Sequence, residues 1–238
     1  MRSKRPMPAA TIRYFNPRKA ILGVFATTLA LSLMCSLSIQ RGHADVPIAA
    51  TATEIQPLRA GQDAPRFTVE TIDNEPFDFD PRKLEHPAIV ISFRGGWCPY
   101  CNMHLSELRH VLPDIHEMGI DVLFLSGDRP ELLYSSLGDD TRDDIDGLDY
   151  QILSDADANA AIAFGIAFRA PKKTIARRHE KGQDITGSSM ALHGVLPVPS
   201  VFAVDTDGVI RFAYSNADYK IRLPADELLE VATSIAVR

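Results

Sequence analysis

The stretch FRGGWCPYC, residues 93–101, directly follows the apolar run PAIVISF at residues 87–93. A continuous apolar run of this length between Pro and Gly is typical of a buried β-strand. The next stretch, NMHLSELRHVLPDI at residues 102–115, has the apolar spacing of an α-helix. The sequence therefore predicts a strand–turn–helix unit with two cysteines, Cys98 and Cys101, at its junction.

The spacing of the two cysteines predicts different environments for them. Cys98 stands where the helix begins, and Pro99 is tolerated in the first turn because its missing N–H has no helical partner there. The partial positive charge at a helix N-terminus lowers the pKa of a cysteine below about 8.5. Cys101 shares one helical face with Leu105 and Leu108, which shields it. We predict that Cys98 is the exposed, attacking thiol and that Cys101 resolves the mixed disulfide.

Two other uses of the cysteines compete with this interpretation. One is a structural disulfide without turnover, although so short a loop restrains little of the unfolded chain. The other is a metal site, since His104, His110 and His116 follow the cysteines. These histidines lack the paired ligand spacing of a zinc finger. With no nucleotide, haem or flavin signature either, we expect no metal and no cofactor beyond the redox-active cysteine pair.

The rest of the sequence predicts strands that alternate with helices. Alternation around Phe67 and Val69, with a turn at residues 73–74, is typical of an N-terminal hairpin. Two strands around a turn at residues 205–208 predict a second antiparallel pair. Further strands are expected at residues 121–128 and 150–155, and helices at residues 129–137, 157–165 and 223–237. This order predicts an α/β fold with a central mixed β-sheet flanked by helices.

Two charged segments interrupt this order. The acidic segment at residues 138–149 lacks the Gly and Glu spacing of a calcium loop, so we expect a solvated loop. The basic segment PKKTIARRHEKGQD, residues 171–184, forms an insertion before the strand that contains Pro199. It is interpreted either as a solvated helix or as an element that recognises an acidic partner or a membrane surface.

The N-terminal segment predicts export. Residues 1–44 contain Lys and Arg but no acidic residue, and residues 20–39 form an uncharged apolar run. These features are typical of a secretory signal cleaved after Ala44, or of a retained membrane anchor. Both leave the body in the periplasm or another extracytoplasmic space, with membrane contact only through an uncleaved anchor. We expect a linker over residues 45–60 and one domain over residues 61–237.

The charge of the chain excludes one class of partner. The formal net charge is −6, and the part beyond the basic residues 1–44 is more acidic still. Nucleic-acid binding needs clustered cations that neutralise phosphates. We therefore expect no nucleic-acid partner.

These motifs together resemble the thioredoxin fold. WCPYC after a buried strand, with VPS at residues 198–200 before a later strand, is similar to the active-site arrangement of that fold. The resemblance implies a cis peptide bond before Pro199, with the proline facing the cysteines. The stretches GQDAPRF, LSGDRPELL, LSDAD and AVDTDGVIRF further resemble the AhpC/TSA redoxin family, the peroxiredoxins and their relatives, over residues 61–237.

The resemblance to peroxiredoxins is incomplete at the site. Their Pro-x-x-x-Thr-x-x-Cys pattern aligns Arg94 with the proline, Cys98 with the threonine and Cys101 with the peroxidatic cysteine. Pro199 aligns with the arginine that stabilises the peroxide in that family. Ser92 stands where thioredoxins keep a buried aspartate. The site is therefore similar to that of a thioredoxin, in a chain that resembles a peroxiredoxin.

From these features we expect an exported thiol–disulfide oxidoreductase of peroxiredoxin-like type, whose partner is a protein dithiol or disulfide. Thiol-dependent reduction of hydroperoxides is the alternative, and a non-catalytic binding module with the same fold is a third. We expect Trp97 and Pro99 to frame the site and Pro199 to orient the substrate. Arg94 is expected to stabilise a thiolate or an anionic substrate, unless it is only a solvated turn residue.

Overall fold

The strand that precedes the cysteines, β3 (Ala88–Phe93), is buried along its whole length in the computed structural model, which describes residues 47–236. It pairs in parallel with β4 (Asp121–Ser126) and antiparallel with β8 (Ser200–Val204). A strand with neighbours on both sides and packing on both faces needs apolar side chains throughout. The continuous apolar run therefore predicted its place in the sheet correctly.

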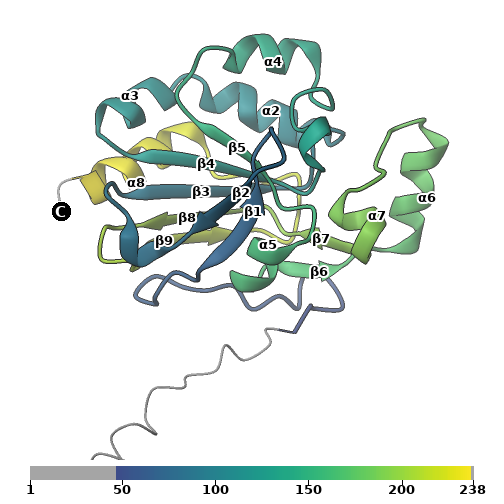
Figure 1. Ribbon diagram of the computed structural model, residues 1–238, viewed down its shortest axis with the longest axis horizontal. Helices are drawn as coiled ribbons and strands as arrows, with labels where there is room; N and C mark the ends of the chain where they lie inside the picture. The colour runs from purple at the N-terminus through teal and green to yellow at the C-terminus, as the bar shows by residue number, and fades with distance from the viewer. Residues whose placement is uncertain (1–46, 237–238) are drawn as a thin grey trace, which may run out of the picture. The chain divides into compact units, whose positions relative to one another are not determined.

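The remaining strands extend the sheet on both sides of β3. Next to β4 lie β5 (Gln151–Ser154), which is parallel to it, and then β1 (Phe67–Glu70), which is antiparallel to β5. β2 (Pro76–Phe79) completes the N-terminal hairpin with β1, and β9 (Ile210–Ser215) pairs antiparallel with β8. The order is β2-β1-β5-β4-β3-β8-β9 (Figure 1). The predicted mixed sheet and both predicted hairpins are confirmed.

Alternate residues of β3 enter two separate cores. Ile89, Ile91 and Phe93 pack in one core with residues of α2, α3 and α8, whereas Ala88 and Val90 pack in the other with residues of α5, β1 and β2. Helices therefore cover both faces of the sheet, as predicted. Their bounds are α2 (Pro99–Leu108), α3 (Leu112–Glu117), α5 (Asn159–Ala163) and α8 (Ala225–Ala236).

The basic insertion lies beside the sheet, between the two strands of a small second sheet. β6 (Ala167–Arg169) and β7 (Val195–Pro197) pair antiparallel, and the chain between them forms α6 (Lys172–Glu180) and α7 (Ser189–His193). Figure 1 shows α6 and α7 at the right of the main sheet. Two-stranded pairing of β6 and β7 was not predicted, because strands of three residues carry too little alternation to be recognised.

The predicted helix at residues 102–115 is in fact two helices. α2 ends at Leu108, and α3 begins at Leu112 with Pro113 in its first turn. A proline inside a helix removes a hydrogen bond and clashes with the preceding turn, whereas in a first turn it costs nothing. The chain therefore breaks before Pro113.

The helix expected at residues 129–137 is also wrong. Only a single 3₁₀ turn forms there, η2 (Pro130–Leu132). The Ser136 hydroxyl donates to Asp128 Oδ2 at 3.0 Å, so this segment folds back onto the end of β4. Short side-chain hydrogen bonds of this kind compete with helix formation.

The solvated loop expected at residues 138–149 is wrong as well, because the segment contains α4 (Asp139–Ile145). Asp139 and Asp140 lie in its first turn, where the helix dipole favours acidic side chains. Thr141 and Ile145 are buried and anchor the helix to the body.

Several sequence features lie near or beyond the limits of the described residues. Part of the predicted linker at residues 45–60 contacts the body, since Ala49 N–H donates to Ala167 O and Leu58 N–H to Phe164 O. The apolar run at residues 20–39 and the cleavage site at Ala44 lie outside the described residues. Within residues 47–236, no helix is both long and apolar enough to cross a membrane.

Another short 3₁₀ turn, η1 (Pro81–Lys83), follows β2.

Candidate functional site

Both cysteines lie at the start of α2, directly after β3. Cys98 is the residue before the first helical position and has extended backbone angles, and Pro99 occupies the first turn. The Cys101 N–H donates to the Cys98 carbonyl at 2.9 Å, which closes that turn. The strand–turn–helix unit and the place of each cysteine in it are therefore as predicted.

Two glycines before the cysteines allow close packing under the site. A Cβ on Gly95, whose φ is +140°, would lie 2.5 Å from Trp97 Nε1 and 2.6 Å from Asp128 Oδ1. A Cβ on Gly96 would lie 2.6 Å from the backbone carbon of Ser136. Glycine is the residue that permits backbone approach of this kind.

The two sulfurs have opposite acidities. The pKa of Cys98 is lowered to about 6, first by the hydrogen bond that the Cys101 side chain makes to it. The Cys101 N–H and the positive charges of Arg222 and Arg94 add to this effect, while burial opposes it. Burial raises the pKa of Cys101 above its usual value, and the neighbouring Cys98 raises it further. Cys98 is therefore the nucleophilic thiolate near neutral pH, and Cys101 holds its proton.

Cys98 is less exposed than the sequence predicted. Both cysteines are unpaired thiols, and the exposed fraction of Cys98 is 2% against 0% for Cys101. Cys98 nevertheless lines a cavity of about 610 Å³, and Cys101 is not among the lining residues. Cys98 therefore lines a hollow although almost none of its surface is exposed, because it follows directly on β3, a strand inside the sheet.

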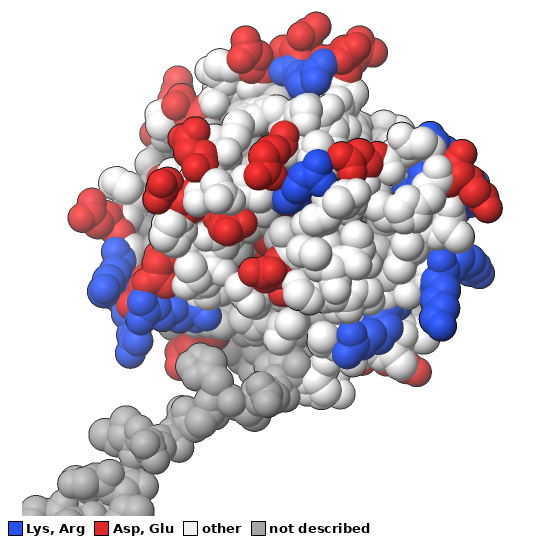
Figure 2. All heavy atoms as spheres, turned by 45° about the vertical axis from the view of Figure 1, so that its right-hand side comes forward, with Lys and Arg blue, Asp and Glu red and all other residues white. Residues whose placement is uncertain are grey.

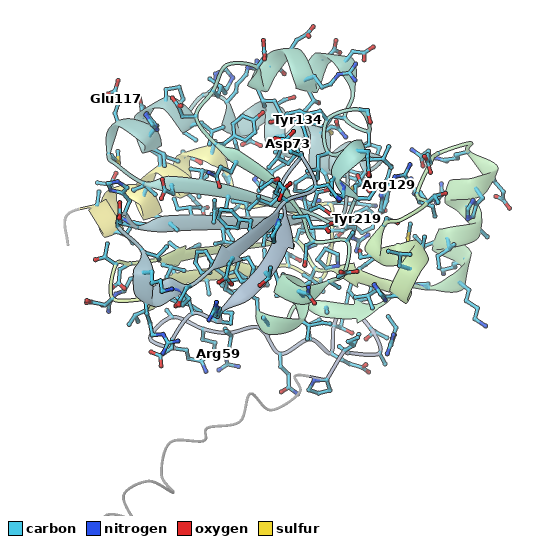
Figure 3. The ribbon with its side chains drawn as sticks, viewed as in Figure 1. Arg59, Asp73, Glu117, Arg129, Tyr134 and Tyr219 are labelled. Atoms are coloured by element: carbon cyan, nitrogen blue, oxygen red, sulfur yellow. The ribbon has the colours of Figure 1, made fainter. Side chains whose placement is uncertain are left out.

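Two arginines lie beside the sulfurs. Arg222 Nη2 donates to Cys101 Sγ at 3.4 Å, and Arg222 Nη1 donates to the Tyr219 carbonyl. Arg94 is buried, with its guanidinium 4.2 Å from the centre of the Tyr219 ring. The solvated-turn interpretation of Arg94 is therefore wrong. Figure 3 places Tyr219 on the side of the sheet that faces α6 and α7.

Trp97 connects the site to the basic insertion. Its indole lines the cavity, and the guanidinium of Arg178 lies 4.8 Å from the indole ring. Gln183 Nε2 donates to the Trp97 carbonyl at 3.2 Å, and Gln183 Oε1 accepts from Arg178 Nη1 at 2.8 Å. Arg178 and Gln183 therefore hold the end of α6 over Trp97, which the sequence did not predict.

A buried carboxyl supports the turn from behind. Asp128 Oδ2 accepts from the Gly96 N–H at 2.8 Å and from Ser136. Burial raises the pKa of Asp128 to about 6, although these hydrogen bonds and Trp97 oppose the rise. Nothing in the sequence near Asp128 marks this role, because it depends on β4 lying next to β3.

Pro199 does not have the expected geometry. No cis peptide bond occurs within residues 47–236, so the bond before Pro199 is trans. The Val198 N–H donates to the Ile166 carbonyl, and the chain continues in extended form from β7 into β8. An extended chain can keep the peptide bond before the proline in the trans form, which is the more stable one. Pro199 is buried and is absent from the cavity lining, whereas Pro99 lines it.

The histidines after the cysteines are separated by the fold. The His104 ring is buried and lies 3.0 Å from the Leu223 carbonyl, and its pKa is lowered to about 4 by burial. His116 forms an exposed ion pair with Asp149 at 3.6 Å. Within residues 47–236, no three His, Cys, Asp or Glu side chains are grouped so as to hold a metal ion.

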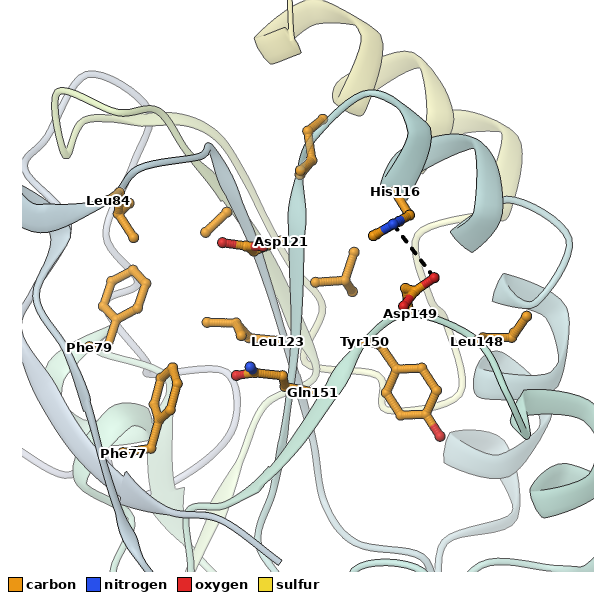
Figure 4. A pocket seen from close by; sticks show the side chains of 13 residues that line it. Phe77, Phe79, Leu84, His116, Asp121, Leu123, Leu148, Asp149, Tyr150 and Gln151 are labelled. Carbon is orange, nitrogen blue, oxygen red and sulfur yellow. Dashed lines mark ion pairs between the residues drawn. The ribbon is translucent and has the colours of Figure 1, made fainter.

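A second hollow, of about 380 Å³, lies at the opposite end of the sheet (Figure 4). Its lining includes Ala88 and Asp121, the first residues of β3 and β4, together with Phe77 and Phe79. The cysteines follow the other end of β3. This hollow therefore has no access to the sulfurs, and none of its lining residues is a cysteine.

The lowered pKa of Cys98 predicts an unusual pH dependence of alkylation. For the reduced protein, the rate of Cys98 alkylation by iodoacetamide should rise with pH and reach half its maximum at about pH 6. Below that pH the sulfur is protonated and unreactive. In Cys101→Ala the hydrogen bond to Cys98 is lost, so the midpoint should move up toward the usual value of about 8.5.

Peptide mass spectrometry measures this rate separately for each of the three cysteines. Cys101 in the same protein serves as the internal control, and it should remain unmodified through pH 8 because its pKa is raised. A Cys98 midpoint above pH 8 would contradict the electrostatic description of the pair.

Comparison with known proteins shows the family and the fold. The sequence profile of the AhpC/TSA family matches residues 60–213. Thiol-disulfide oxidoreductase ResA of Halalkalibacterium halodurans is 27% identical over 108 residues, which are 45% of this chain and 57% of that relative, less than two thirds of its length. Peroxiredoxin Bcp of Escherichia coli is 28% identical over 115 residues, which are 47% of this chain and 67% of that protein.

Solved structures support the same fold. A yeast mitochondrial 1-Cys peroxiredoxin superimposes with a TM-score of 0.57 at 18% identity, and the match covers 76% of this chain and 77% of that one. A peroxiredoxin-like protein from Aquifex aeolicus superimposes with a TM-score of 0.54 at 17% identity, over 76% of this chain and 89% of that one. At these identities the similarity establishes a thioredoxin-like fold of the peroxiredoxin type.

Proposed function

The chain belongs to the AhpC/TSA family, and from this premise we propose that residues 61–237 act as an exported thiol–disulfide oxidoreductase. Cys98 and Cys101 cycle between a dithiol and a disulfide. The observation that carries the proposal is the difference between the two sulfurs: Cys98 has a pKa of about 6 and lines a cavity, and Cys101 is buried behind it with a raised pKa. Thiol–disulfide exchange needs one attacking and one resolving thiol in this arrangement.

The reaction transfers two electrons from the protein to a substrate disulfide. The Cys98 thiolate attacks one substrate sulfur, the substrate S–S bond breaks, and the other sulfur leaves as a thiolate that takes the proton of Cys101. Cys101 then attacks Cys98 Sγ, and the second substrate sulfur leaves as a thiolate. Arg94 and Arg222 stabilise the negative sulfurs, while Trp97 and Pro99 frame the entrance. In reverse, the same steps oxidise a dithiol.

Reduction of hydroperoxides is the second candidate, and one contact favours it. Arg222 Nη2 lies 3.4 Å from Cys101 Sγ, and Cys101 aligns with the peroxidatic cysteine of peroxiredoxins. In the sequence alignment, Pro199 stands at the position of the arginine that stabilises the peroxide in peroxiredoxins. Arg222 supplies an arginine beside the aligned sulfur from another part of the chain. Two properties of Cys101 oppose this function: it has no exposed surface and its pKa is raised, so it holds little thiolate at neutral pH.

Stopped-flow oxidation of the fully reduced, full-length protein separates the two functions. The signal is the fluorescence of Trp97, the only tryptophan, which lies beside Cys98. We expect a small disulfide to oxidise the protein at least about tenfold faster than it oxidises dithiothreitol, because Cys98 carries more thiolate at pH 7. Hydrogen peroxide should react no faster with the protein than with dithiothreitol. Fast peroxide oxidation that persists in Cys98→Ser would identify Cys101 as peroxidatic and replace the proposal.

A further inference from the structure

The cavity above Cys98 is lined almost entirely by cationic and aromatic side chains. Trp97, Tyr100 and Tyr219 supply the aromatic part, and no lining residue is acidic. The lining cations come from three separate parts of the chain, namely the turn before α2, α6 with the residue after it, and the loop before α8: Arg94, Lys173, Arg177, Arg178, Lys181 and Lys220.

These positive charges are not neutralised by the protein itself. Among residues 47–236, none of the six lining cations forms an ion pair. Asp184, close to the end of α6, pairs with Arg129 instead. Clustered like charges without counter-ions produce a positive potential in a concave site. Salt should weaken it, because Lys173, Arg177, Lys181 and Lys220 are exposed.

α6 carries cations at both ends, and those in its first turn do not favour its stability. Lys172 and Lys173 occupy its first turn, where the positive end of the helix dipole disfavours cations, and that turn contains no acidic residue. The helix also has no buried side chain. The two first-turn lysines are therefore not explained by the helix dipole, and Lys173, Arg177 and Arg178 of this helix line the cavity.

The positive cavity contrasts with the rest of the molecule. The formal net charge is −6, and Figure 2 shows acidic side chains gathered at the top of the view, with Lys and Arg side chains lower on both the left and the right. General surface charge therefore does not account for six cations around one reactive sulfur. The cavity also has the size of a small-molecule site, since such pockets hold roughly 300–1,000 Å³.

Resting on the proposed function, we propose that the disulfide attacked by Cys98 belongs to a small anionic molecule with carboxylates on both sides of its S–S bond. Lys173, Arg177 and Lys181 bind these carboxylates while the sulfurs lie on Cys98. The step is the exchange described above: the protein dithiol becomes a disulfide, and the substrate leaves as two carboxylated thiols.

Three small disulfides of similar size test this proposal: dithiodipropionate, which is anionic, dithiodiethanol, which is neutral, and cystamine, which is cationic. Each second-order rate constant with the reduced full-length protein is divided by its rate constant with dithiothreitol, which removes intrinsic reactivity. We expect the anionic disulfide to exceed the neutral one by at least about tenfold at low salt, and the cationic one to be slowest. The preference should shrink as salt is added.

Charge-reversal variants locate the effect on α6. In Arg177→Glu and Lys181→Glu the rate with dithiodipropionate should fall by at least about tenfold, while the rate with dithiodiethanol stays within about twofold. Lys172→Glu is the matched control, because Lys172 belongs to the same helix but does not line the cavity. It should leave all three rates nearly unchanged. An unchanged dithiodiethanol rate also shows that the variants are folded and reactive.

The outcomes separate this inference from the function on which it rests. If neither the three small disulfides nor an acidic peptide disulfide oxidises the protein faster than it oxidises dithiothreitol, the proposed function fails. If dithiodiethanol reacts as fast as dithiodipropionate, and Lys172→Glu acts like Arg177→Glu, exchange stands but the anionic substrate class is wrong. A preference only for an acidic peptide disulfide over all three small molecules would replace the small substrate by a protein segment.

Discussion

Replacing Cys98 with serine is expected to lower the rate at which disulfides oxidise the protein by at least about three orders of magnitude. The reason is that Cys98 is the only cysteine among residues 47–236 that lines the cavity, and in the proposed mechanism its thiolate is the nucleophile of the first step. Cys101 cannot take its place, since it is fully buried, its pKa is raised, and the lost Cys98 leaves it without a partner.

Replacing Cys101 with serine should stop the reaction one step later. Cys98 can still attack, but no thiol resolves the mixed disulfide, so the substrate stays bound to Cys98. Intact-protein mass spectrometry measures the added mass, and the two variants serve as each other's controls. Rapid oxidation in Cys98→Ser, or a mixed disulfide located on Cys101, would reverse the assigned roles of the two sulfurs.

The sequence predicted the local structure correctly where that structure depends on residues adjacent in the chain. The apolar run before Phe93, the Gly pair and the helical spacing after Pro99 are local signals, and they placed both cysteines at the start of α2 correctly. The shielding of Cys101 followed from the same spacing, since Leu105 and Leu108 are buried with it. The exposure of Cys98 did not follow, because it depends on what the rest of the fold builds around the turn.

The surroundings of the sulfurs were beyond the sequence. Arg222 lies 121 residues from Cys101, and no pattern connects the two. Asp128 reaches Gly96 only because β4 pairs in parallel with β3. The basic insertion was noticed for its charge, but the sequence could not say that Lys173 lines the cavity and that Lys172 does not. Long-range contacts of this kind are decided by the whole sheet topology.

The mistaken elements have a common physical cause. Residues 129–137 have helical spacing, yet the hydrogen bond of Ser136 to Asp128 ties them to the end of β4. Residues 138–149 are polar enough for a loop, yet burial of Ile145 is sufficient to hold α4 against the body. In both places tertiary contacts decide between local conformations of similar free energy.

Gly96→Ala is expected to lower the free energy of unfolding by about 3 kcal/mol, the upper part of the range for forced overpacking. A Cβ at Gly96 would lie 2.6 Å from the Ser136 carbonyl carbon and 2.7 Å from Leu137 N, and closer still to Ser136 Oγ. Two of these three atoms belong to the backbone, so rotation of a side chain cannot relieve the overlap. The turn must move away from Ser136 and Leu137, which also breaks the hydrogen bond from the Gly96 N–H to Asp128.

The matched control is Gly138→Ala, at the residue directly after Leu137, which Gly96 contacts. A Cβ there would be 3.6 Å from Asn102 Oδ1, an ordinary contact, and Gly138 has a negative φ of −63°. Its cost should stay below about 1 kcal/mol, mainly from the change of capping residue at α4. Urea unfolding followed by Trp97 fluorescence measures both variants. Equal stability of Gly96→Ala and the unmodified protein would mean that the turn before Cys98 is not held against Ser136. The position of Cys98 in the cavity lining would then lose its structural basis.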